Sequence, residues 1–306
     1  MSQRNRSKMS RRTLLGNLGI GVPSIFFLSS RTAGRERPQR IVNNRINQSV
    51  AYWCFKKYWD IEEMCQVAKR LGIKSIELLG IEGLDKLRGY WDAFKAHDIV
   101  DGMHFCHGFE KGMNNPENWD MCLKALRDGI DACAAYGFPN VLTFTGFRVP
   151  HVSDDYGIKI CVKGYKKIIG YAEKKKVNIC LEILNSRVAE EMMGHPGYQG
   201  DHTDYCMEII RKVGSPRMKL LFDIYHVQVM DGDIIRRIRQ YKDYIGHYHT
   251  AGNPGRREID DKQEINYKPI MEEIVRTGYT GYVGQEFVPT GDPLMGLTEA
   301  VVLCDV

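Results

Sequence analysis

Residues 177–223, VNICLEILNSRVAEEMMGHPGYQGDHTDYCMEIIRKVGSPRMKLLFD, carry the pattern that decides the fold. Two short apolar runs, 177–183 and 218–223, are typical of buried strands. Between them, residues 201–213 have apolar side chains at the i, i+3, i+4 spacing of a helix, and Gly214 follows, as glycine often does at a helix end. The stretch therefore predicts a strand, a helix and a second, parallel strand.

The same alternation continues in both directions along the chain. The other predicted strands are 46–53, 73–78, 99–106, 140–145, 244–250 and 281–287. The other predicted helices are 60–71, 84–97, 116–136, 155–175, 233–241 and 267–277, with a last, short helix after Pro289. Eight such repeats in about 260 residues match the length of a (β/α)₈ barrel. A doubly wound sheet would more often have fewer strands and a glycine-rich phosphate turn, which the sequence lacks. We therefore predict an α/β fold with a single TIM barrel domain over residues 46–306.

The segment before the barrel is strongly basic. Ten of the Lys and Arg residues lie before residue 46 with one acid, Glu36, so the barrel itself is close to neutral although the chain carries a net charge of +5. Residues 10–15, SRRTLL, resemble a twin-arginine signal and begin a moderately apolar run to residue 28. We expect a signal segment at 1–34 and a linker at 35–45. A disordered basic tail and a membrane anchor are the alternatives, although the glycines of this run would make a poor spanning helix.

These observations bear on location and partners. A twin-arginine signal predicts export of the folded protein, with the periplasm as the destination and the cytoplasm as the alternative. A nearly neutral barrel gives no reason to expect nucleic-acid binding, and we expect no stable membrane insertion. A homo-oligomer is compatible with the sequence.

Nine cysteines are spread singly over the chain, with no C-x-x-C motif. Their positions within predicted strands and helices favour small, buried apolar side chains. Disulfides are the alternative, because an exported protein meets an oxidising environment.

Four predicted strands end in residues that bind metals. In barrels the reacting groups lie at the carboxyl ends of the strands, and here these are Glu182, Asp223, His249 and Glu286. A single acid at a strand end is more often a helix cap or a surface group. Glu182 and Glu286 follow apolar residues, however, where an unpaired carboxylate is costly to bury. The four together predict a site for one divalent cation, Mn²⁺, Mg²⁺ or Co²⁺. His247 points to the same side as His249 but lies farther from the strand end, so we expect it to be a core residue or a support for the ligands.

The residues around these strand ends resemble a known family. The strings LEILNSR (181–187), FDIYH (222–226), GHYH (246–249) with PGR (254–256), and GYVGQE (281–286) resemble the xylose isomerase-like sugar isomerase/epimerase superfamily, and most closely its hydroxypyruvate isomerase branch. The resemblance covers residues 46–290. It implies that Glu182, Asp223, His249 and Glu286 bind the metal, and that both glutamates exchange protons with a small hydroxy-carbonyl or sugar substrate through an enediolate.

The same resemblance implies that His226 and Arg256 bind substrate oxygens. An exposed loop is the alternative for both, particularly for Arg256, which stands beside a second arginine. Further pocket candidates are Trp53, His107 and Arg187, the last in a long loop at 184–200 that could act as a lid.

Three other functions remain open at this point. His249 favours the ketose 3-epimerases, since hydroxypyruvate isomerases often have glutamine at that position. Asp223 and His226 match the Asp-x-x-His motif of endonuclease IV-like enzymes, but those need three metals and a further Asp-x-His motif that the sequence lacks. A catalytically silent, sugar-binding barrel would have no need of the glutamate pair.

Overall fold

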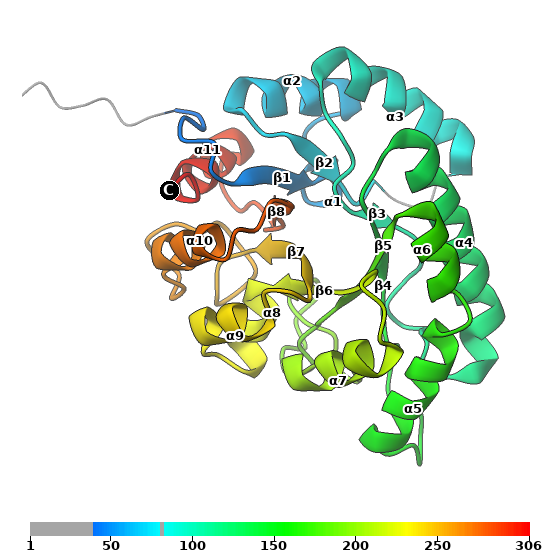
Figure 1. The fold of residues 1–306 in the computed structure, drawn as a ribbon. Helices are drawn as coiled ribbons and strands as arrows, with labels where there is room; N and C mark the ends of the chain where they lie inside the picture. Colours follow the sequence, from blue (N-terminus) through cyan, green and yellow to red (C-terminus); the bar gives the residue numbers. More distant parts are fainter. Residues whose placement is uncertain (1–38, 80–82) are drawn as a thin grey trace, which may run out of the picture. The chain divides into compact units, whose positions relative to one another are not determined.

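The computed structural model describes residues 39–79 and 83–306, and within them it confirms the TIM barrel (Figure 1). Eight parallel strands form one sheet in the order β2-β1-β8-β7-β6-β5-β4-β3. They are β1 Asn47–Ala51, β2 Ser75–Glu77, β3 His104–Phe105, β4 Asn140–Thr143, β5 Asn178–Glu182, β6 Met218–Asp223, β7 Ile245–Thr250 and β8 Tyr282–Gln285. Backbone hydrogen bonds from Ile76 N to Val100 O (3.0 Å) and from Leu78 N to Met103 O (3.0 Å) join β2 to the segment before β3, so the sheet is nearly closed.

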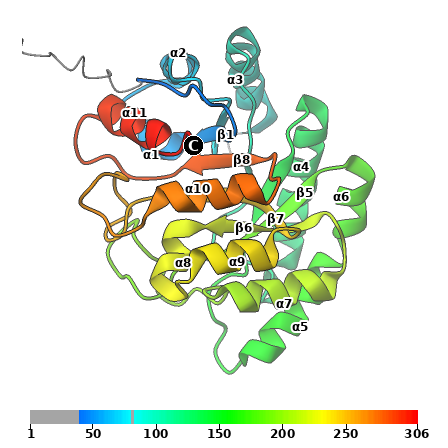
Figure 2. The ribbon, with the colours of Figure 1, turned by 60° about the vertical axis from the view of Figure 1, so that its left-hand side comes forward.

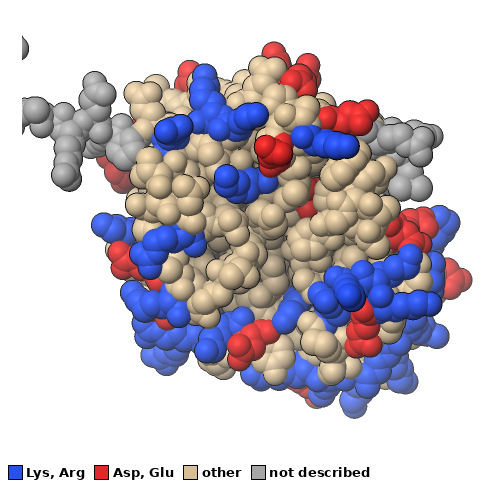
Figure 3. Space-filling view, turned by 45° about the horizontal axis from the view of Figure 1, so that its top comes forward, with Lys and Arg blue, Asp and Glu red and all other residues tan. Residues whose placement is uncertain are grey.

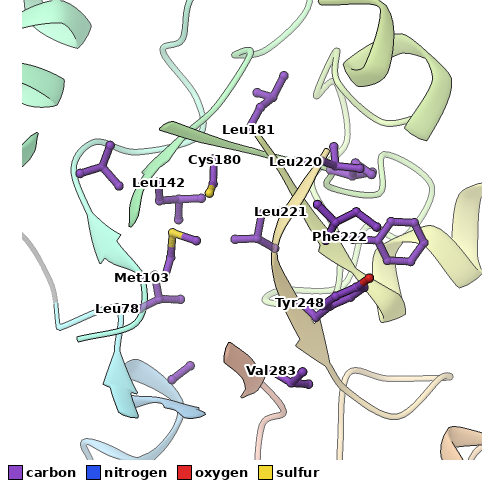
Figure 4. Close-up of a cluster of buried hydrophobic side chains, with 14 of the residues drawn as sticks. Leu78, Met103, Leu142, Cys180, Leu181, Leu220, Leu221, Phe222, Tyr248 and Val283 are labelled. Carbon is purple, nitrogen blue, oxygen red and sulfur yellow. The ribbon is translucent and has the colours of Figure 1, made fainter. Parts of the chain in front are cut away.

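Helices surround this sheet on its outer side (Figures 1 and 2). They are α1 Tyr52–Phe55, α2 Ile61–Leu71, α3 Gly83–His97, η1 Pro116–Asn118, α4 Trp119–Tyr136, α5 Asp154–Tyr165, α6 Ile169–Lys175, α7 Thr203–Val213, α8 Ile224–Met230, α9 Ile234–Tyr241, α10 Tyr267–Arg276 and α11 Pro293–Leu303. Because helices cover one face of the strands and the barrel interior lies on the other, both faces need apolar residues. Figure 4 shows Leu142 and Leu221 toward the middle of the barrel and Phe222 and Tyr248 on the opposite side of their strands.

All eight predicted strands are present, although the one predicted at 99–106 is reduced to the two residues of β3, and the helices differ in several places. The strand predicted at 46–53 runs two residues too far at its end, because Tyr52 and Trp53 begin α1. The helix predicted at 155–175 is two helices, α5 and α6. The last helix, α11, has 11 residues and is longer than expected. The glycine predicted to end α7, Gly214, has a φ of 77°, the left-handed conformation of a helix C-cap.

Two helices were not predicted, the four-residue α1 and the longer α8. The helix α8 follows β6 directly. Its first turn is stabilised by Asp223, whose Oδ1 accepts a hydrogen bond from the backbone N–H of His226 at 3.1 Å. A side chain that caps a helix in this way satisfies a backbone donor at the helix start. His226, which we expected on a loop, therefore lies in the first turn of a helix.

The predicted signal segment at 1–34 lies outside the described residues. At the end of the predicted linker, the backbone N–H groups of Val42 and Asn43 donate to the Asp305 carboxylate at 2.6 and 2.8 Å. This part of the linker is therefore in contact with the end of the chain. Among the described residues, none of the helices is both long and apolar enough to cross a membrane.

Charged side chains lie on the surface of the protein, and the cysteines lie in its interior. On the face shown in Figure 3, basic and acidic side chains lie mainly around the edge, and uncharged residues form its middle. All nine cysteines are buried free thiols, which confirms their interpretation as apolar core residues.

Candidate metal centre

The four predicted ligands converge at the carboxyl ends of β5 to β8. Their ligand atoms all lie within 4.8 Å of one another, and all four side chains are buried. His249 Nδ1 is 3.0 Å from Glu286 Oε2, 3.3 Å from Glu182 Oε1 and 4.0 Å from Asp223 Oδ2. The structure therefore brings together the ligand set that the strand ends predict.

The register of the strands explains this convergence. Asp223 on β6 is paired with His249 on β7, and His249 is paired with Gly284 on β8. Residues paired in a parallel sheet point to the same face, and side chains alternate along each strand. Asp223 and His249 therefore point into the barrel, and so does Glu286, two residues beyond Gly284.

The site concentrates negative charge in a buried place. Burial, together with the neighbouring Glu286, raises the pKa of Asp223 to about 7. Burial also raises the pKa of Glu182. Burial opposes protonation of His249, yet Glu286, Glu182 and Glu77 raise the pKa of its imidazole well above the ordinary value. Because carboxylates this close disfavour one another's charge, a cation among them would be strongly favourable. Three carboxylates and one imidazole suit a hard divalent cation.

Glu286 differs from the other carboxylates because both of its oxygens have partners. Trp53 Nε1 donates to Oε1 at 2.9 Å, and Arg256 Nη2 donates to Oε2 at 2.6 Å. Burial would raise the pKa of Glu286, but Arg256 and His249 lower it well below the ordinary value. Two residues expected at the substrate, Trp53 and Arg256, thus contact a metal-ligand candidate directly.

Arg256 does not lie in an exposed basic loop. Its side chain is buried, whereas the neighbouring Arg257 is exposed. The guanidinium lies 5.3 Å from the centre of the Trp53 ring and also donates to the backbone oxygen of Met192 at 3.2 Å. Its Nε is buried with no hydrogen-bond partner, so this N–H can donate to a bound molecule.

His226 is also held ready to donate. Its Nδ1 lies 3.0 Å from the backbone N of Asn185 and 2.7 Å from the side-chain nitrogen, and it accepts from them, so the ring proton belongs on Nε2. Burial, with Arg256 nearby, lowers the pKa of His226 well below the ordinary value, so the ring is neutral. Nε2 is buried without a partner and lies 3.7 Å from Asp223 Oδ2. The site therefore presents an uncommitted N–H beside the ligand cluster.

Two predicted substrate residues lie elsewhere. Both ring nitrogens of His107 have partners in the protein, Thr143 Oγ1 and the backbone oxygen of Gly108, each at 3.0 Å. Arg187 is exposed and donates to the backbone oxygen of Val229 at 3.2 Å. Neither residue lines the cavity at the ligand cluster. His226 does not line it either, but its free Nε2 lies beside Asp223.

Sequence reasoning missed Glu77, which lies beneath the ligand cluster. The side chain is fully buried, and Oε1 lies 3.0 Å from His249 Nε2 and 3.1 Å from His247 Nε2. Ser49 Oγ donates to Oε2 at 2.5 Å. Burial would raise the pKa of Glu77, but His247 and His249 lower it to about 2. An ionised Glu77 keeps a proton on His249 Nε2 and turns Nδ1 toward the three carboxylates.

Glu77 stands at the end of β2, so the rule that selected the other four residues could have found it. The Glu77 side chain fits here only because the residue that it contacts on β8, Gly284, has no side chain. A Cβ on Gly284 would lie 2.0 Å from Glu77 Oε1. The structure also places His247 in this deeper layer, where its sequence position put it.

A (β/α)₈ barrel with buried carboxylates and one histidine at the carboxyl ends of β5–β8 defines a class of barrels with an acidic site suited to a divalent cation. Within this class, the chain belongs to the xylose isomerase-like TIM barrel family, which matches residues 65–300.

Two curated relatives and one solved structure illustrate the comparison. The putative hydroxypyruvate isomerase of Homo sapiens is 30% identical over 183 residues, 57% of this chain and 64% of that protein. The hydroxypyruvate isomerase of Escherichia coli K12 is 36% identical over 176 residues, 56% and 66%. The chain thus spans less than two thirds of both relatives. The structure of the 3-keto-D-glucoside 4-epimerase YcjR from E. coli aligns with a TM-score of 0.70 and 17% identity, covering 85% of this chain and 98% of that one, which shows a shared fold.

Proposed function

We propose that the protein is a metal-dependent isomerase or epimerase of sugars or small α-hydroxy carbonyl compounds. The observation that carries the proposal is the convergence of Glu182 and Glu286 with Asp223 and His249 on one buried point. The similarity to the E. coli hydroxypyruvate isomerase supports the isomerase reading.

One divalent cation, Mn²⁺, Mg²⁺ or Co²⁺, would be held by Glu182, Asp223, His249 Nδ1 and Glu286. Such an ion, when bound, polarises a carbonyl, acidifies the adjacent C–H and stabilises the enediolate charge that develops. His226 Nε2 and Arg256 Nε, both buried without partners, would donate to substrate oxygens and orient the substrate.

The two glutamates would have unequal roles. Burial raises the pKa of Glu182, and a carboxylate with a raised pKa is the stronger base. Glu286 is held by Trp53 and Arg256, which keep it ionised. We assign proton removal to Glu182, which is then protonated and can return the same proton at the neighbouring carbon, giving isomerisation. Epimerisation needs a proton delivered to the same carbon from the opposite face, and Glu286, ionised in the free protein, would have to take up a proton from solvent before it could deliver one.

A ketose 3-epimerase is the second candidate, and His249 favours it. The imidazole Nδ1 faces all three carboxylates, so His249 would act as a metal ligand. In the resemblance described above, hydroxypyruvate isomerases often have glutamine at this position. An endonuclease-like function would need three ions. The described residues offer two candidate groups, which share His249.

Deuterium uptake from solvent tests the proposed function. The Mn²⁺-loaded protein would be incubated in D₂O with hydroxypyruvate, tetruloses and hexuloses, and nuclear magnetic resonance would locate the label. We expect uptake at the carbon next to the carbonyl in at least one compound, and the position of the product carbonyl separates isomerisation from epimerisation. Absence of uptake in the whole panel would contradict the proposal.

Replacing Glu77 with glutamine should weaken metal binding without removing a ligand. The amide has one acceptor oxygen and one nitrogen, so it cannot accept from both His247 and His249 and from Ser49. Loss of such a supporting contact typically costs about 10- to 100-fold in metal affinity. Titration calorimetry with Mn²⁺ would measure this. Glu208→Gln, at an exposed glutamate on α7, is the matched control, and equal affinity in the two variants would exclude a positioning role for Glu77.

A further inference from the structure

We propose that the substrate carries an uncharged, apolar group next to its hydroxy-carbonyl unit. The site would then prefer neutral α-hydroxy ketones with an alkyl, aryl or deoxygenated substituent over compounds such as hydroxypyruvate, whose substituent is a carboxylate. This inference rests on the proposed function and narrows its substrate class.

The cavity at the ligand cluster has a polar side and an apolar side. Its volume is about 340 Å³. The polar side contains Glu182, Glu286 and Arg256. The apolar side consists of residues from the ends of β3 and β4 and the segments that follow β2 to β5, namely Leu78, Phe105, Phe109, Leu142, Phe144 and Leu184. A substrate whose hydroxy-carbonyl unit meets the polar side must place its remaining atoms against this wall.

The aromatic rings of the wall form a connected surface. The centre of the Phe144 ring lies 6.3 Å from the ring centres of both Phe105 and Phe109, and both pairs pack edge to face. Phe109 and His195 lie 4.2 Å apart. Such rings gain energy from apolar or C–H surface placed against them, whereas burying a carboxylate against them without a partner is costly.

The charged groups around the cavity leave no positive charge to pair with a substrate carboxylate. Glu182, Asp223 and Glu286 together carry three negative charges when ionised, and Arg256 with a divalent cation would balance them. Arg256 is already bonded to Glu286 at 2.6 Å and lies 3.9 Å from Asp223. An anionic substrate would therefore bring an unbalanced charge.

Two other side chains at the cavity could in principle offer a positive charge. Burial, with Arg256, lowers the pKa of His195 to about 4, so this ring is neutral near pH 7. Lys56 lines the cavity but is exposed, and an exposed ammonium is weakly attractive because water and salt screen it. Among the described residues that line the cavity, therefore, none is a buried, unpaired cation that could bind a substrate carboxylate.

Hydroxamates test the inference without turnover, because each presents the same metal-chelating –CO–NHOH unit on a different substituent. Acetohydroxamate carries a methyl group, benzohydroxamate a phenyl ring and oxalohydroxamate a carboxylate. Calorimetry would measure their binding to the full-length, Mn²⁺-loaded protein. We expect benzohydroxamate to bind about tenfold or more tightly than acetohydroxamate, since a phenyl ring buries more apolar surface, and oxalohydroxamate to bind most weakly.

A pair of variants separates the wall from intrinsic chelation. Phe109→Ala should weaken benzohydroxamate about tenfold and leave acetohydroxamate nearly unchanged. Tyr156→Ala, at an aromatic residue of α5 that is 55% exposed and does not line the cavity, is the matched control and should change neither.

The outcomes distinguish this inference from the function beneath it. Tightest binding of oxalohydroxamate, or equal weakening of all three compounds by Phe109→Ala, would overturn the apolar-substituent inference and leave the metal-dependent function standing. If none of the three hydroxamates binds the loaded protein, the proposed metal centre fails and the inference fails with it.

Discussion

Glutamine at position 182 or at position 286 is expected to abolish deuterium exchange into substrate. Both side chains belong to the buried ligand cluster, and an amide cannot take up or return a proton near pH 7. Loss of a positioned acid or base typically costs about 10²- to 10⁴-fold in rate. The exchange rate in D₂O, followed by nuclear magnetic resonance at saturating Mn²⁺, measures the effect.

The controls for these variants must separate lost chemistry from lost structure. Glu208→Gln removes the same charge at an exposed residue of α7 that does not line the cavity, and it should keep the wild-type rate. Circular dichroism should show unchanged folding for Glu182→Gln, because it removes one of several buried carboxylates that repel one another. Glu286→Gln also takes a partner from Arg256, so a lower melting temperature is expected there. Retained exchange in either glutamine variant would remove that glutamate from the proposed proton transfer.

Chelation by EDTA is expected to remove all exchange activity, and added Mn²⁺ or Co²⁺ should restore it. We expect tight metal binding for an electrostatic reason. The buried carboxylates disfavour one another's charge, as the pKa of Asp223, raised to about 7, indicates, and a cation among them removes that penalty. A cation bound only by the folded state also stabilises it, by about 2.7 kcal/mol at a metal concentration 100 times the dissociation constant. The melting temperature should therefore rise with added Mn²⁺ as activity returns.

EDTA already saturated with Mn²⁺ serves as the control for effects of the chelator itself. Metal analysis of the restored protein should find one ion per chain. Full activity in the metal-free protein would contradict the proposed mechanism, and three ions per chain would instead favour an endonuclease-like function.

Much of the site was predictable because it follows from the geometry of a barrel. Once residues 218–223 and 244–250 are recognised as neighbouring parallel strands, Asp223 and His249 must lie at the same end of the sheet. The same rule applies to Glu182 and Glu286. It required no knowledge of side-chain contacts, and the structure places all four within reach of one ion.

The rule was less informative for residues beyond the strand ends. Trp53 was assigned to a strand and lies in α1, yet its indole still reaches Glu286. His107 follows β3 closely but turns both nitrogens toward protein atoms. For such residues, the direction of the side chain depends on the local path of the loop, which periodicity does not determine.

The sequence by itself determined the succession of eight strands and helices, because the periods of apolar residues differ between the two and can be counted along the chain. It also determined which strands end in residue types that can bind a metal. Only the tertiary structure decided that Glu77 supports His249, that Arg256 is buried against Glu286 and that the wall opposite the ligands is aromatic. These contacts join residues as many as 172 positions apart. The sequence pattern around each residue shows its local structure but not which distant side chain it contacts.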